Sequence, residues 1–169
     1  MKDKKYNYAL VVGKFDPIHI GHEKLINKAL EVSIKTLVLV TNSAKEKISI
    51  SKRIKLISNI YEKDILQNKL CVEEFINPST FNLNYGDMLF DKYYNIFNSY
   101  PEVIIYGNDK DITFCFRKEL ISKIDSIIIK RDGNSSTKVR QLLKSNDNIK
   151  IKNMINEKII EDIDKSIFS

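Results

Sequence analysis

Both histidines of the chain lie in one short segment, Gly13–His22, which reads Gly-Lys-Phe-Asp-Pro-Ile-His-Ile-Gly-His. A strand-like apolar run, Tyr8–Val12, precedes this segment, and a helical pattern, Glu23–Leu30, follows it. A strand that delivers a glycine-containing loop to a helix N-terminus can build a phosphate site, because free amides and the positive end of the helix dipole favour anions. Residues three apart share a helix face, so His19 and His22 could donate to the same phosphate.

A second candidate anion site follows the last strand-like run of the chain. Residues 131–140 read Arg-Asp-Gly-Asn-Ser-Ser-Thr-Lys-Val-Arg and lead into a helical pattern. Hydroxyls and amides at a helix start bind anions, and Arg140 lies one turn further along. The hydroxyls could instead serve only as helix caps, which is common for serine and threonine. The presence of the histidine segment in the same chain favours phosphate binding.

Both segments resemble signatures of the nucleotidylyltransferase superfamily, whose members transfer AMP or CMP onto a phosphate. Gly13–His22 is similar to the first signature. Ser135–Arg140 is similar to the second signature, which holds the outer phosphates of the nucleotide, although Asn134 stands where the family usually has isoleucine. Class I aminoacyl-tRNA synthetases share His-x-Gly-His, but they are far longer than 169 residues, and the only lysine-rich lookalike here, residues 47–52, follows the second predicted strand.

The resemblance implies a role for each matching residue. His19 and His22 would donate hydrogen bonds to the α- and β-phosphates, and Lys14 would bridge the phosphates of both reactants, so these three are the expected catalytic residues. The implied nucleotide-binding residues are Gly13, Phe15, Gly21, Gly107, Asn108, Asp109, Ser135, Ser136, Thr137 and Arg140. Arg53 and Arg131 resemble positions that bind the substrate phosphate in pyridine-nucleotide adenylyltransferases.

The details of the signatures favour one branch of the superfamily. Lys14 and the spacing from Arg131 to the serines are similar to archaeal-type and bifunctional bacterial nicotinamide mononucleotide (NMN) adenylyltransferases. Phosphopantetheine adenylyltransferases usually have threonine or serine in place of His19. Cytidylyltransferases usually have Gly-Thr-Phe-Asp and a longer spacing. We therefore expect AMP transfer from ATP to NMN or its acid form, with release of pyrophosphate.

Several alternatives stay open at this point. The chain could be a cytidylyltransferase, a phosphopantetheine adenylyltransferase or a non-catalytic nucleotide-sensing domain of the same fold. Tyr85, Phe90 and Tyr93 are candidates to stack on the acceptor ring, although aromatic residues at helical spacing are more often core. Mg²⁺ would arrive with ATP, because no carboxylate cluster predicts a metal site formed by protein ligands alone.

The rest of the chain predicts the elements that position these residues. Short apolar runs alternate with helical patterns, which is typical of βαβ units and a parallel sheet covered on both faces. Beyond the first strand and helix, we expect strands at 36–40, 69–75, 102–106 and 125–130 and helices at 51–61, 88–100, 137–144 and 153–167. We thus expect one α/β domain over residues 1–169, a Rossmann-like parallel sheet of about five strands with helices on both faces and ligands at the carboxyl ends of the strands.

Composition limits the partners. The formal net charge is +6 and the pI is near 9.1, but the lysines are spread along the chain, so small phosphorylated substrates are favoured over nucleic acid. No apolar run predicts a membrane span or a signal segment, and we expect a cytoplasmic homo-oligomer. Cys71 and Cys115 lack Cys-x-x-Cys spacing and a nearby histidine, which predicts buried thiols.

Overall fold

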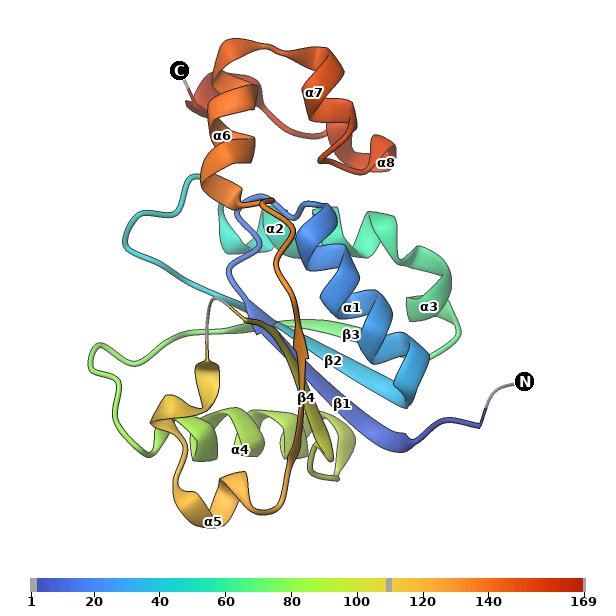
Figure 1. Cartoon of the computed structure of the whole chain (residues 1–169), viewed down its shortest axis with the longest axis vertical. Helices are drawn as coiled ribbons and strands as arrows, with labels where there is room; N and C mark the ends of the chain where they lie inside the picture. Colours follow the sequence, from blue (N-terminus) through green and yellow to red (C-terminus); the bar gives the residue numbers. More distant parts are fainter. Residues whose placement is uncertain (1–2, 109–110, 169) are drawn as a thin grey trace.

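The computed structural model describes residues 3–108 and 111–168 (Figure 1). Its centre is a five-stranded, fully parallel sheet in the order β3-β2-β1-β4-β5. The strands are β1 Tyr6–Gly13, β2 Ser33–Thr41, β3 Leu70–Phe75, β4 Val103–Gly107 and β5 Asp125–Ile129. All five expected strands form, and the Rossmann-like prediction is confirmed.

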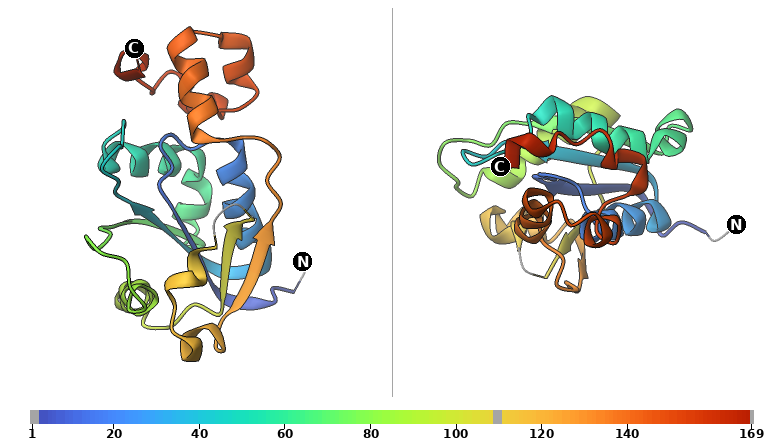
Figure 2. Two further views of the ribbon diagram at one scale, coloured as in Figure 1. Left: turned by 60° about the vertical axis from the view of Figure 1, so that its left-hand side comes forward. Right: turned by 90° about the horizontal axis from the view of Figure 1, so that it is seen from above.

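Helices cover both faces of the sheet, and a group of short helices lies beyond its carboxyl edge (Figures 1 and 2). The α-helices are α1 Ile20–Val32, α2 Ile50–Ile60, α3 Glu62–Leu66, α4 Tyr85–Phe97, α5 Lys118–Ile121, α6 Ser136–Ser145, α7 Asn148–Lys152 and α8 Glu157–Ile160. The 3₁₀ turns are η1 Ile112–Cys115 and η2 Lys165–Phe168. No helix of the described ranges is long and apolar enough to cross a bilayer.

Alternating side chains of the central strands form two separate cores. Val11 of β1 and Val38 of β2 pack with α1, α2 and the C-terminal helices, whereas Leu10 and Leu37 pack with α4 on the other face. All four side chains are fully buried. Because successive side chains of a strand point to opposite faces, an unbroken apolar run is what a strand covered on both faces requires.

The C-terminal segment differs from its prediction. A single helix over 153–167 is wrong, because α7, α8 and η2 are separated by turns. Asn156 accepts a hydrogen bond from the Lys158 amide at the start of α8, and Asp164 accepts hydrogen bonds from the Ser166 amide and hydroxyl. Such local side-chain bonds to backbone compete with a continuous helix. The apolar residues that suggested the helix, among them Met154, are buried nonetheless.

Helix α4 begins and ends three residues earlier than the expected span of 88–100. Its C-cap, Asn98, adopts a left-handed conformation with φ of 50°. Asparagine tolerates this conformation better than most residues, so it terminates the helix at Phe97.

Candidate functional site

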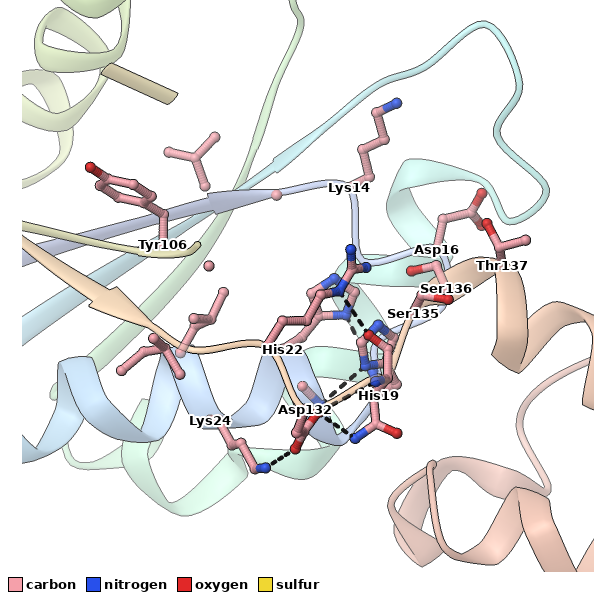
Figure 3. A pocket seen from close by; sticks show the side chains of 18 of the residues that line it. Lys14, Asp16, His19, His22, Lys24, Tyr106, Asp132, Ser135, Ser136 and Thr137 are labelled. Carbon is pink, nitrogen blue, oxygen red and sulfur yellow. Dashed lines mark hydrogen bonds and ion pairs between the residues drawn. The ribbon is translucent and has the colours of Figure 1, made fainter. Parts of the chain in front are cut away.

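A cavity of about 450 Å³ opens at the carboxyl ends of β1, β4 and β5 (Figure 3). β1 and β4 are neighbours in the sheet, but they are separated along the chain by β2 and β3. The chain therefore changes direction across the sheet at β1, and ligands of such folds bind at this switch point. The volume lies in the range of small-molecule and cofactor sites.

Most of the expected site residues line this one cavity. They are Gly13, Lys14, His19, Gly21, His22, Gly107, Arg131, Ser135, Ser136, Thr137 and Arg140. Phe15, Arg53 and Asn108 do not line it, and Asp109 lies outside the described residues. Two segments far apart in the sequence, the one after β1 and the one after β5, thus meet at a single site.

The two histidines form the start of α1 and hold each other in place. His19 is the N-cap residue, and its Nδ1 accepts a hydrogen bond from the Gly21 amide at 3.1 Å. The Nδ1 of His22 accepts one from the His19 amide at 3.4 Å, and the two ring centroids lie 3.9 Å apart. Because both Nδ1 atoms accept, each neutral imidazole carries its proton on Nε2. The pair therefore has two N–H donors in adjacent, fixed rings.

The amides at this helix start are used within the protein. The amides of His22 and Glu23 donate to the carbonyl of His19 at 2.9 and 3.0 Å. The amide of Ile20 donates to the Met154 carbonyl, at 2.9 Å, in the C-terminal segment. The expectation that free amides bind an anion here is therefore wrong, because the capping interactions and the C-terminal segment satisfy them. The imidazoles and the helix dipole are what this end of α1 can offer a phosphate.

Two glycines of the histidine segment permit this close packing. A Cβ atom at Gly13 would lie 3.1 Å from the Phe15 ring, and one at Gly21 would lie 2.9 Å from Cε1 of His19. Phe15 is fully buried, has φ of 52° and places its ring centroid 4.9 Å from that of His22. Phe15 therefore packs against His22, and its side chain does not line the cavity in which the nucleotide was expected.

The start of α6 presents more donors than the start of α1. The Ser135 hydroxyl caps the helix by accepting from the Lys138 amide at 3.1 Å. Within the described part of the chain, the amides of Ser136 and Thr137 have no protein partner. Arg140 donates to the carbonyl of Asp16 at 2.7 Å and to the Thr137 hydroxyl at 3.3 Å. Hydroxyls, amides and a guanidinium therefore gather here, as a phosphate site requires.

Side-chain contacts shape the loop before α6. Asn108, directly after β4, accepts a hydrogen bond from the Arg131 amide at 2.9 Å, so it positions the loop instead of lining the cavity. The Arg131 side chain donates to the Asn134 carbonyl at 3.0 Å. Asp132 forms an ion pair with Lys24 of α1, which joins the second segment to the first (Figure 3).

Several lining residues were missed by sequence reasoning. Ser43 and Lys45 follow β2, so the rule that ligands collect at the carboxyl ends of strands could have found them. Lys24 and Lys130 carried no distinguishing signal, whereas Tyr106 directly precedes Gly107, one of the expected nucleotide-binding residues. Six lysine and arginine side chains line the cavity, against two carboxylates, Asp16 and Asp132, which both have protein partners. Such a lining attracts polyanions.

The three aromatic candidates for acceptor stacking belong to α4, and their side chains are buried in the core that α4 shares with the sheet instead of lining the cavity. The Tyr93 hydroxyl donates to the Ala9 carbonyl at 3.1 Å. The Tyr85 hydroxyl donates to Asn77, and burial raises the pKa of Tyr85 to about 12. Phe90 is buried beside Phe116. Tyr106, at the end of the cavity away from the serines, is the lining tyrosine (Figure 3).

Arg53 is fully buried, so its expected contact with substrate phosphate is not seen. Its guanidinium bonds three carbonyls and the carboxylate of Glu46. Among residues 3–108 and 111–168, no group of three or more His, Cys, Asp or Glu side chains could hold a metal ion.

The fold and the cavity define an α/β protein in which two segments that each follow a strand and begin a helix meet at the switch point of the sheet. The cytidylyltransferase-like family matches residues 10–152, and the chain belongs to this family of nucleotidylyltransferases. No curated protein sequence matches the chain significantly.

Solved structures with a similar fold include three pyridine-nucleotide enzymes. The bifunctional NMN adenylyltransferase/ADP-ribose pyrophosphatase of Francisella tularensis, complexed with AMP and a manganese ion, is 19% identical with a TM-score of 0.67 over 83% of this chain, which spans 42% of that protein. A putative nicotinate-nucleotide adenylyltransferase of Vibrio parahaemolyticus is 18% identical (TM-score 0.64, 97% and 95% covered). The Plasmodium falciparum nicotinic acid mononucleotide adenylyltransferase, complexed with NaAD, is 19% identical (TM-score 0.62, 96% and 98% covered). At this identity the likeness shows the fold.

Proposed function

We propose that this nucleotidylyltransferase transfers AMP from ATP to the phosphate of NMN or its acid form and releases pyrophosphate. The observation that carries the proposal is that the two fixed imidazoles and the donor-rich start of α6 line one cavity. A nucleoside triphosphate laid across this cavity would place its inner phosphates at the imidazoles and its outer phosphates at α6.

The chemistry needs positioning and charge stabilisation more than a covalent intermediate. An oxygen of the acceptor phosphate attacks the α-phosphorus in line, the bond to the bridging oxygen breaks, and pyrophosphate leaves with that electron pair. His19 and His22 would donate from Nε2 to the α- and β-phosphates, where charge develops in the transition state. Ser136, Thr137 and Arg140 would hold the leaving pyrophosphate.

Lys14 would bridge the phosphates of the two reactants. It follows β1 directly, lines the cavity and is exposed, with a side chain that points away from the imidazoles (Figure 3). Arg131, which lines the cavity, would contact the phosphate of the acceptor where it meets the α-phosphate of ATP. Mg²⁺ would enter as the magnesium complex of ATP, since this ion is commonly held through substrate phosphates.

The nucleoside would occupy the β4–β5 end of the cavity. Gly107 ends β4 without a side chain, and Ile112 and Ile129 give this end an apolar lining. Apolar lining with a few backbone polar groups is typical of a site for a base and ribose. The acceptor would then lie beside Lys14 and Ser43, at the β1–β2 end.

The identity of the acceptor rests on the residues of the histidine segment and on the pyridine-nucleotide enzymes of similar fold. The family description makes CTP the competing donor. The test is pyrophosphate release with ATP and CTP, each combined with NMN, its acid form, phosphopantetheine and a phosphorylated alcohol. We expect release with ATP and a pyridine mononucleotide. If pyrophosphate is released only with CTP and the alcohol, the assignment of ATP and a pyridine mononucleotide is wrong, but the assignment of nucleotidyl transfer stands.

A further inference from the structure

Arg53 is the largest fully buried side chain among the described residues, although arginine is almost never fully buried unless its charge is paired. Its Nε donates to the Ile48 carbonyl at 2.8 Å. Its Nη1 donates to the carbonyls of Lys14 and Thr41 at 2.5 and 2.8 Å. Its Nη2 donates to the Glu46 carboxylate at 2.6 Å, which compensates its charge.

The partners of Arg53 belong to two segments that line the cavity. Lys14 lies directly after β1. Thr41 ends β2, and Glu46 and Ile48 belong to the following loop, whose Ser43 and Lys45 line the cavity. One buried guanidinium therefore fixes the backbone from which Lys14 projects and, at the same time, both ends of the loop that carries Lys45.

Asp16 is a second anchor of the same loop. Its carboxylate accepts from the amides of Lys47 and Ile48 at 2.8 and 2.9 Å, and its carbonyl accepts from Arg140 at 2.7 Å. Ile48 is thus fixed through its N–H by Asp16 and through its carbonyl by Arg53. These bonds connect α6, the histidine segment and the loop after β2 in one partly buried network.

We propose that Arg53 is a positioning residue for the transfer reaction, which acts by fixing Lys14 and the loop after β2 at the acceptor end of the cavity. The inference rests on the proposed function for its catalytic consequence. Arg53 cannot itself contact the substrate phosphate in this arrangement, because it is fully buried and its charge faces Glu46. A guanidinium is required because its rigid fork of five N–H donors reaches acceptors in several directions, which the single ammonium of lysine cannot do.

A double-mutant cycle between Arg53→Lys and Lys14→Met tests this. Misplacement of a reacting group by about 1 Å can cost about 100-fold in rate, so Arg53→Lys should lower kcat by about 10- to 100-fold with a smaller change in the KM of the acceptor. In the Lys14→Met background the same change should cost less than about threefold, since residues that act as a unit are not additive. Fully additive losses, or a loss confined to KM, would contradict a positioning role.

Glu46→Gln is a second variant for the case in which Arg53→Lys does not fold. The Glu46 side chain is 34% exposed, and removing its charge leaves the three bonds from Arg53 to carbonyls in place. It should lower kcat by about three- to tenfold, again through Lys14. Glu62→Gln on α3, an exposed carboxylate whose side chain has no protein partner among the described residues, is the matched control and should leave kcat unchanged. Equal kcat in both glutamine variants would overturn the proposal.

Amide hydrogen exchange separates this inference from the proposed function. In Glu46→Gln or Arg53→Lys, the amides of residues 43–48 should exchange at least about tenfold faster, while those of β1 and β4 keep their protection. If the wild-type protein transfers nucleotide to none of the acceptors, the proposed function fails, but faster exchange in Arg53→Lys still supports the anchoring of the loop by Arg53, whereas Glu46 also accepts directly from the Ser43 amide. Unchanged exchange of residues 43–48 would overturn the anchoring whatever the activity.

Discussion

The two segments that meet in the cavity are built in opposite ways. In the histidine segment, Phe15 and His19 are buried and the amides at the start of α1 are bonded within the protein. In the second segment, residues 131–133 are exposed, and the amides of Ser136 and Thr137 have no partner among the described residues. The first segment thus holds its imidazole donors in fixed positions before a ligand binds. The second segment has backbone amides that can donate hydrogen bonds to a ligand.

This difference suggests a division of labour. Preorganised donors are most effective where charge develops in the transition state, because they need no rearrangement at that moment. Donors on an exposed loop suit a group that must bind and later leave, such as the outer phosphates of ATP. We therefore expect changes in the histidine segment to affect kcat and changes in the serine segment to affect ATP affinity.

The largest expected effect comes from His22. Removing one preorganised donor to developing charge typically costs about 10²–10³ in kcat. His22→Gln is the sharpest variant, because glutamine at this position of a helix start can keep the capping bond to the His19 amide. Single-turnover kinetics should show the loss while thermal melting stays near that of the wild type. Normal turnover in the folded variant would remove the imidazole from the mechanism.

Arg140→Ala tests the binding half of the comparison. Loss of charge-assisted hydrogen bonds costs about 1.5–3 kcal/mol, which corresponds to roughly ten- to hundredfold in the Kd of ATP. Calorimetric titration with a non-hydrolysable ATP analogue measures it, and the Kd of the acceptor should change much less. Because Arg140 also bonds the Asp16 carbonyl, Arg140→Lys serves as the variant that keeps the charge. An unchanged Kd for the analogue would make Arg140 a purely structural residue.

A pair of glycine substitutions compares the two segments directly. In Gly21→Ala the new methyl group would lie 2.9 Å from the His19 ring, so the imidazole must move and kcat should fall by about tenfold. In Gly133→Ala the methyl group meets no atom within 4 Å, but φ of 84° is unfavourable for alanine and should cost about 1 kcal/mol of stability. Kinetics and thermal melting of both variants are the measurements. A larger loss of kcat in Gly133→Ala would reverse the comparison.

The smallest effect is expected at the ion pair between the segments. Lys24 and Asp132 are both substantially exposed, and exposed pairs contribute about 0–1 kcal/mol. Asp132→Asn should therefore change the melting temperature little. The difference in melting temperature from the wild type should be smaller at high salt than at low salt, because salt screens an exposed ion pair. Melting at low and high salt measures it, and a large destabilisation would show that the serine segment depends on this pair for its position.

Much of this arrangement could be predicted from the sequence. Apolar runs located all five strands, and His19, His22 and Ser135–Thr137 were placed at one site because each follows a strand of a parallel sheet. The use of the amides at α1 could not be foreseen, because the capping bonds come from histidines and one amide is bonded by Met154, far away in the chain. The burial of Arg53 could not be predicted either, because it depends on carbonyls of Lys14 and Thr41 that only the fold brings together.

Formation of a dinucleotide from the magnesium complex of ATP and NMN or its acid form tests the central claim most directly. The wild-type protein should form product and pyrophosphate in equal amounts, and His22→Gln should do so at least about 100-fold more slowly. Product from CTP and a phosphorylated alcohol, with none from either pyridine mononucleotide, would contradict the assignment of donor and acceptor. No transfer with any pair would contradict the account of the site itself.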